Sequence, residues 1–144
     1  MIVVMDSVII KSSNSSNELL LSEQDGLQHS GDSEYYRVTL KVKDLLASAK
    51  IYAFQPYSEL SQFFEDLAAN WRGWKGKKEW QSLEGEFSLS CTSDGLGHVA
   101  IDVVLKSGFY DNDWSVHTAI NVDAGQLEEI ASNIKQFFSV QTTV

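Results

Sequence analysis

Apolar and polar residues alternate along much of the chain, and alternation with a period of two is typical of strands that bury one face. Residues 1–34 hold two apolar runs, Ile2–Ile10 and Leu19–Leu21, separated by the polar run Lys11–Asn17. This polar run, rich in Ser and Asn, cannot bury enough surface to order itself. We interpret it as a loop between two strands, with a flexible N-terminal arm as the alternative.

Residues 35–122 form the patterned body of the chain and predict five more strands. A short turn near Asp44 joins the first two, and Pro56 breaks the chain after the second because proline cannot donate a ladder hydrogen bond. Further on, the glycines of Ser93–Gly97 favour a tight turn. The strands predicted in the body cover residues 38–42, 47–54, 87–91, 99–105 and 114–122.

Two segments change to the spacing of amphipathic helices. In the first, apolar residues recur at helical spacing over residues 60–71, with Ser58 as the expected N-cap. The second covers residues 123–139, and it opens on Asp123 and Gln126, which resemble a capping box.

These elements predict an α+β fold, in which an antiparallel, meander-like β-sheet of about six strands carries two amphipathic helices packed on it. The chain has 144 residues, so one core is the simplest arrangement. We expect a single domain over residues 1–144, with a core at 35–139 and an N-terminal extension of strands and loop at 1–34. No internal repeat is visible in the sequence.

The net charge of -9 creates a field that repels nucleic acid and anionic membranes and attracts basic partners. No apolar run approaches the roughly 20 residues that span a bilayer, and the N-terminus lacks the basic leader and cleavage site of a signal peptide. The single cysteine, Cys91, excludes an internal disulfide and agrees with a reducing compartment. We therefore expect a cytoplasmic protein that binds neither nucleic acid nor membrane.

The chain contains no phosphate-binding glycine motif, zinc-protease motif or nucleophile elbow. His98, Asp102 and His117 are the candidates for acid–base chemistry, because a hairpin turning near residues 109–110 would pair His117 with Asp102. An ordinary polar pair on an exposed sheet face is the alternative. Too few ligands converge for a metal site, and Cys91 is expected to point inward as a small hydrophobe. We therefore expect no catalytic residue, metal or cofactor.

The segment Trp71–Trp80 is unusual because it carries three tryptophans and four basic residues in an acidic chain. The simplest interpretation is structural: Trp71 ends the helical stripe, Trp80 starts the next strand and the lysines are solvated. A protein–protein hot spot, where Trp and Arg are enriched, is the second interpretation. Binding of single-stranded nucleic acid comes third, since the charge of the whole protein opposes it.

Four stretches carry a family resemblance: Trp71–Gly76, Trp80–Gly85, Asp94–Val99 and Gly125–Ala131. Together they resemble a bacterial family of unknown function that is itself similar to the WapI-type immunity proteins, which are encoded beside contact-dependent toxins. The resemblance covers about residues 35–139 and implies a small cytoplasmic binder that occludes a toxin. It carries over no functional residues. Gly85 and Gly97 are expected at turns or bulges, and Leu83 in the core.

The leading hypothesis is an immunity-type protein that neutralises a partner toxin, such as a basic nuclease domain, through a protein–protein interface that an acidic surface helps to form. Carboxylates at predicted outward positions and loops form the expected binding face, and the tryptophans are further candidates. These residues are Trp71, Trp74, Trp80, Glu84, Glu86, Asp102, Asp111 and Asp113. The alternatives are a generic interaction or scaffold domain, including a homo-oligomer built on the three tryptophans, and a small hydrolase that uses His98, Asp102 and His117.

Overall fold

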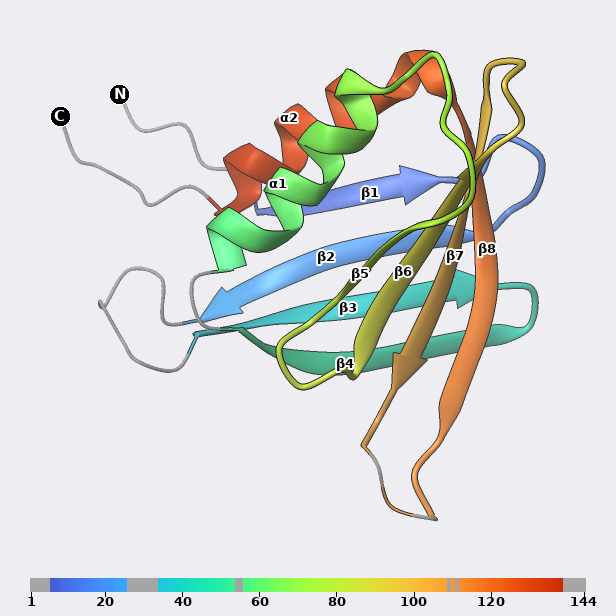
Figure 1. Ribbon diagram of the computed structural model, residues 1–144. Helices are drawn as coiled ribbons and strands as arrows, with labels where there is room; N and C mark the ends of the chain where they lie inside the picture. The colour runs from blue at the N-terminus through green and yellow to red at the C-terminus, as the bar shows by residue number, and fades with distance from the viewer. Residues whose placement is uncertain (1–5, 26–33, 54–55, 109, 111, 139–144) are drawn as a thin grey trace, which may run out of the picture.

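The computed structural model describes residues 6–25, 34–53, 56–108, 110 and 112–138 (Figure 1). Eight strands and two helices follow one another in a regular order. The strands are β1 (Ser7–Lys11), β2 (Glu18–Asp25), β3 (Glu34–Val42), β4 (Leu45–Ala53), β5 (Lys78–Gln81), β6 (Phe87–Ser93), β7 (His98–Lys106) and β8 (Ser115–Asp123). The helices are α1 (Pro56–Ala69), between β4 and β5, and α2 (Leu127–Phe138), which follows the short 3-10 turn η2 (Ala124–Gln126).

The strands form two antiparallel sheets, with the orders β1-β2-β3-β4 and β5-β6-β7-β8. The α+β class and the antiparallel meander are therefore confirmed, but the prediction of one sheet with about six strands is wrong. Alternation specifies which face of a strand is buried and not which strands share a sheet. The element order also repeats, since each meander of four strands is followed by a helix.

The core lies between the two sheets and the helix pair. Strands of the second sheet run across those of the first, and α1 and α2 lie side by side along one margin (Figure 1). Each strand turns alternate residues inward, as in β1, where Val8 and Ile10 are buried and Ile9 is exposed. Side chains such as Val38, Ile101 and Ile134 are fully buried, and each contributes roughly 1.5–3 kcal/mol of hydrophobic stabilisation.

The polar run of the N-terminal zone is a loop between two strands, as predicted. It also covers the outer edge of β8. The Ser13 amide donates to the Asn121 carbonyl at 2.7 Å, the Asn121 amide donates to Ser12 Oγ at 3.0 Å, and Asn17 Nδ2 donates to Thr118 Oγ1 at 3.1 Å. These bonds satisfy edge groups of β8 that would otherwise be open to pairing with another chain.

Several turn predictions are confirmed. Asp44 has φ 61° between β3 and β4, and Gly85 and Gly97 have φ 79° and 95°, values that favour glycine. Two local predictions are wrong. Helix α1 begins at Pro56, so Ser58 lies inside it, because the fixed φ of proline suits a first helical position. Leu83 is 55% exposed, since it lies in the turn between β5 and β6.

Candidate functional site

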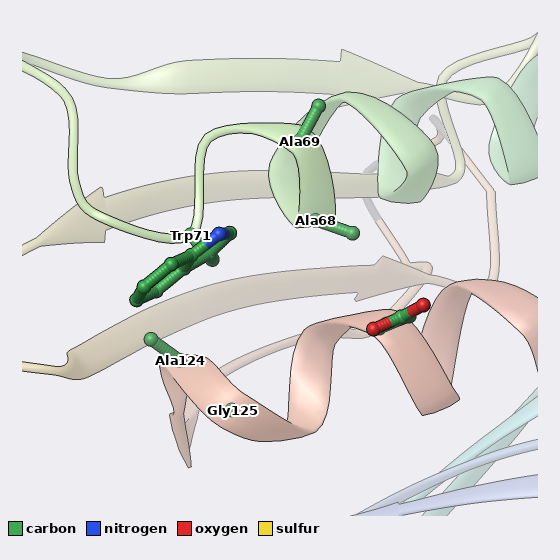
Figure 2. A pocket seen from close by; sticks show the side chains of 6 residues that line it. Ala68, Ala69, Trp71, Ala124 and Gly125 are labelled. Carbon is green, nitrogen blue, oxygen red and sulfur yellow. The ribbon is translucent and has the colours of Figure 1, made fainter.

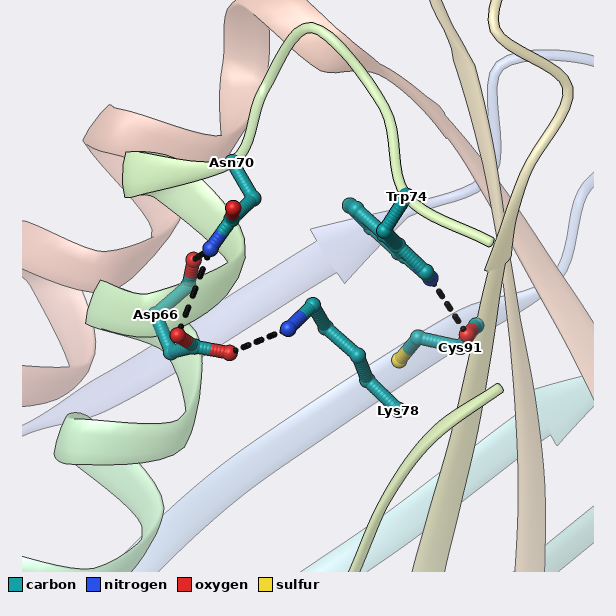
Figure 3. Close-up of polar contacts among 5 residues, drawn as sticks. All are labelled: Asp66, Asn70, Trp74, Lys78 and Cys91. Atoms are coloured by element: carbon teal, nitrogen blue, oxygen red, sulfur yellow. Dashed lines mark hydrogen bonds and ion pairs between the residues drawn. The ribbon is translucent and has the colours of Figure 1, made fainter. Parts of the chain in front are cut away.

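The segment that follows α1 places its three tryptophans in different environments. Trp74 is half-buried against the core, and its indole Nε1 donates to the Cys91 carbonyl at 3.0 Å (Figure 3). Lys78 Nζ lies 2.9 Å from Asp66 Oδ2 on α1 and 5.9 Å from the centre of the Trp74 ring. Asn70 Nδ2 donates to the Asp66 carbonyl at 2.8 Å. Trp74 therefore ties the segment to β6 and has a structural role.

Trp80 is also half-buried. It lies in β5, and its ring packs edge-on against Phe87 with the ring centres 5.5 Å apart. The structural interpretation is thus supported for Trp80, and Trp74, on which it made no prediction, has a structural role as well. Its expectation that the lysines are merely solvated is wrong for Lys78, which pairs with Asp66.

Trp71 differs from both because it is 53% exposed. Its ring forms one wall of an open hollow of about 590 Å³ between the end of α1 and the start of α2. Figure 2 shows the Ala124 side chain pointing toward this ring. The other described residues that line the hollow are Ala68, Ala69, Gly125 and Glu128. We call this site the Trp71 hollow.

One cation already lies against the wall of the hollow. The guanidinium carbon of Arg72 is 5.1 Å from the centre of the Trp71 ring, a distance typical of a cation–π contact. Glu128, in the first turn of α2, carries the only charge among the described residues that line the hollow. The hollow therefore combines an aromatic wall, a floor of small apolar residues and one carboxylate.

The carboxylates expected to form a binding face differ in their exposure. Glu84 and Asp102 are exposed, but Glu86 is 9% exposed and its carboxylate accepts a hydrogen bond from Ser82 Oγ. The outward placement of Glu86 is therefore wrong, because the turn at Gly85 directs this side chain inward. Asp113 is half-buried and accepts the Tyr110 amide at 2.9 Å, which shapes the β7–β8 loop.

Asp111 lies outside the described residues.

The structure does not assemble the candidate acid–base residues. Strands β7 and β8 pair Asp102 with Ala119, and His117 with Val104, so the expected pairing of Asp102 with His117 is wrong by two residues. His117 Nε2 lies 3.1 Å from Ser115 Oγ. His98 Nδ1 lies 2.7 Å from Asp94 Oδ2 in the turn before β7.

Cys91 points inward as predicted and is fully buried. Burial raises the pKa of its thiol to about 12, with a further contribution from the charge of Asp102. A thiol with this pKa is not a nucleophile at neutral pH. Among the described residues, no three His, Cys, Asp or Glu side chains are grouped to hold a metal ion.

A second, smaller hollow of about 470 Å³ lies on the outer face of the second sheet. Its polar lining includes Glu79, Ser90 and Asp102, which the register places in one row across β5, β6 and β7. Its aromatic residue is the half-buried Trp80, which packs on Phe87, and no helix end lines it among the described residues.

Sequence analysis singled out Trp71 but missed the rest of its hollow. The missing residues are Ala68, Ala69, Ala124, Gly125 and Glu128. They lie at the ends of two predicted apolar stripes. The signals for them were the pair Ala68–Ala69 close to a tryptophan and, for Gly125 and Glu128, the family-like stretch Gly125–Ala131.

The fold and the hollow define the class of the protein: an α+β protein of two four-stranded antiparallel sheets with an aromatic-walled hollow between two helix ends. The chain belongs to the family of unknown function DUF6228, whose model matches residues 10–141. The match begins within β1, so it includes N-terminal strands that the sequence resemblance left out. No curated protein and no solved structure matches the chain. The family match shows no link to the WapI-type immunity proteins.

Neither helix in the described residues is long and apolar enough to cross a bilayer.

Proposed function

We propose that the protein is a small, non-catalytic binding protein of the immunity type, which neutralises a partner toxin in the cytoplasm through an interface centred on Trp71. The observation that carries the proposal is the 53% exposure of this indole beside an open hollow. Tryptophan is enriched among the hot-spot residues of protein–protein interfaces, because its side chain buries a large area.

Two further features support a binding role. Trp74 and Trp80 are held against the core, so the exposed position of Trp71 is not a property of the whole segment. The net charge of -9 would raise the association rate with a basic partner and lower it with an acidic one.

The test is co-expression of the full chain with the product of each neighbouring gene, read as growth rescue and as co-purification. We expect one neighbour to be toxic and to be neutralised by this chain. Trp71→Ala should weaken the complex by about 30-fold, the loss of a typical hot spot. Trp114→Ala is the matched control, since Trp114 is 39% exposed in the distant β7–β8 loop, and it should retain the affinity.

Two results would contradict the proposal. One is that no neighbouring product is toxic and the chain rescues no poisoned cell. The other is a complex that Trp71→Ala and Trp114→Ala weaken equally. A stable dimer of the chain that Trp71→Ala dissolves would instead support the scaffold hypothesis.

A further inference from the structure

The chemistry of the Trp71 hollow restricts what can enter it. Ala68, Ala69, Ala124 and Gly125 offer no hydrogen-bonding side chain, so they favour the aliphatic part of a guest. The charged side chain on the lining, among the described residues, is the carboxylate of Glu128. A guest that matches both features has an apolar stem and a hydrogen-bond donor or positive charge at its end.

The backbone at the hollow is also more favourable to a cation than to an anion. The C-terminal end of a helix carries partial negative charge, and α1 has no basic residue in its last turn to offset it. The positive end of α2 is offset by Glu128 and Glu129 in its first turn. The two helix ends and their side chains therefore leave a negative balance at the hollow.

Arg72 shows that the ring of Trp71 accepts a guanidinium. Its guanidinium carbon lies 5.1 Å from the ring centre. Arg72 does not line the hollow, so its charge opposes a second cation from outside the site. Removing this charge should strengthen the binding of a basic guest.

We propose that the Trp71 hollow receives an arginine or lysine side chain of a partner protein, with the aliphatic stem against Trp71 and the cation near Glu128. Lysine and arginine bury an apolar stem and keep a charged end in contact with polar groups, which is the combination that the lining offers. The inference rests on the proposed function, because it names the group by which the partner is recognised. The net charge of -9 favours the same kind of partner.

The experiment titrates the full chain with N-acetyl-arginine amide at constant ionic strength. Binding is followed by the NMR signals of the four indole N–H groups, each assigned by a Trp→Phe variant. We expect the Trp71 signal to move, and the Trp74 and Trp80 signals to stay. N-acetyl-citrulline amide, which has the same shape without the charge, should shift Trp71 about threefold less at equal concentration, the effect of one exposed ion pair.

Matched variants separate the parts of the site. Glu128→Gln should weaken binding about threefold, while Glu129→Gln, the adjacent residue outside the lining, should weaken it clearly less because it acts only through the field at the helix end. Arg72→Gln should strengthen binding. Gly125→Leu should abolish it by filling the hollow, because a Cβ at Gly125 meets no atom within 4 Å and no left-handed φ strains the substitution.

Equal shifts of the Trp71 signal with both compounds, or equal weakening by Glu128→Gln and Glu129→Gln, would overturn the inference. Failure here is distinct from failure of the proposed function. If the toxin complex is weakened by Trp71→Ala but unaffected by Glu128→Gln and Gly125→Leu, the proposed binding function stands and the inference of a basic guest is refuted. If the hollow binds N-acetyl-arginine amide but the chain rescues no poisoned cell, the inference about the hollow stands and the proposed function is refuted.

Discussion

The replacement Trp74→Phe separates the structural tryptophan from the exposed one. It removes the indole N–H that donates to the Cys91 carbonyl at 3.0 Å, and Cys91 is fully buried. A buried carbonyl that loses its donor costs about 1–3 kcal/mol. The smaller ring also loses roughly 30 Å² of contact, which at about 25 cal/mol per Å² adds about 0.7 kcal/mol.

Together the two effects amount to about 1.7–3.7 kcal/mol. Because Trp74 is only half-buried, we take the lower part of this range and expect a loss of about 1.7–3 kcal/mol in the free energy of unfolding. For a chain of this length, the loss lowers Tm by roughly 5–10 °C. Urea denaturation followed by far-UV circular dichroism measures it without relying on the tryptophan signal. Trp71→Phe is the control, since it removes the same atoms from an exposed ring and should change stability by less than about 0.5 kcal/mol.

Equal denaturation midpoints for Trp74→Phe and Trp71→Phe would refute this assignment of roles. It would mean that the bond to Cys91 contributes nothing, and Trp74 would again be a candidate for the interface.

Three other predictions follow from single contacts. Cys91 should resist alkylation in the native protein at pH 8 and react on unfolding, because burial raises its pKa to about 12; rapid labelling of the folded chain would contradict this. The hydrogen bond from the Leu96 amide, and to a smaller extent His98, lowers the pKa of Asp94 below its usual 3.8. The ionised carboxylate of Asp94 therefore stabilises the fold above pH 3.8, and this stabilisation is lost as the pH falls through the lower pKa of the folded state. An NMR titration of the Asp94 carboxyl should give a midpoint below 3.8, which His98→Gln raises only in part because the Leu96 bond remains. Asn17→Ala removes two hydrogen bonds of 3.1 Å to β8 and should cost about 1–2 kcal/mol in urea denaturation; an unchanged midpoint would mean that the loop does not hold this edge.

The helices and strands could be predicted wherever a local pattern of apolar residues is compatible with only one kind of element. Alternation in the body located five of the eight described strands, two N-terminal apolar runs located β1 and β2, and the apolar stripe from Leu127 to Phe137 located α2. Strand β5 was anticipated only in the interpretation that Trp80 starts a strand. It has four residues and places the polar Lys78 at a half-buried position, so its sequence shows no apolar alternation. The division into two sheets was missed for another reason. Which strands pair within one sheet depends on contacts between residues far apart in the chain, and a local pattern does not encode these contacts.

The failed site predictions have local geometric causes. The expected pair of Asp102 and His117 needed the β7–β8 hairpin to turn one residue earlier than it does. A shift of two in the pairing keeps both side chains on the outer face but moves them from opposite each other to a diagonal. Glu86 was placed outward by extending the alternation of β6 backward past its first residue, Phe87. The positive φ of Gly85 breaks that alternation.

The Trp71 hollow is a consequence of the repeated element order more than of any motif. Each four-stranded meander ends in a helix, and because the two helices are antiparallel neighbours, the last turn of α1 meets the first turn of α2 (Figure 1). Trp71 and Gly125, far apart in the sequence, therefore line one space. A search for catalytic or ligand-binding side chains overlooks such a site, because Ala68, Ala124 and Gly125 contribute to it only through the small size of their side chains. Ala124 is buried and Ala68 packs against the core, so large side chains there would also disturb the packing of the helices. A Cβ at Gly125 meets no atom within 4 Å, so filling the space beside Trp71 from this position tests binding more directly than deleting a charge does.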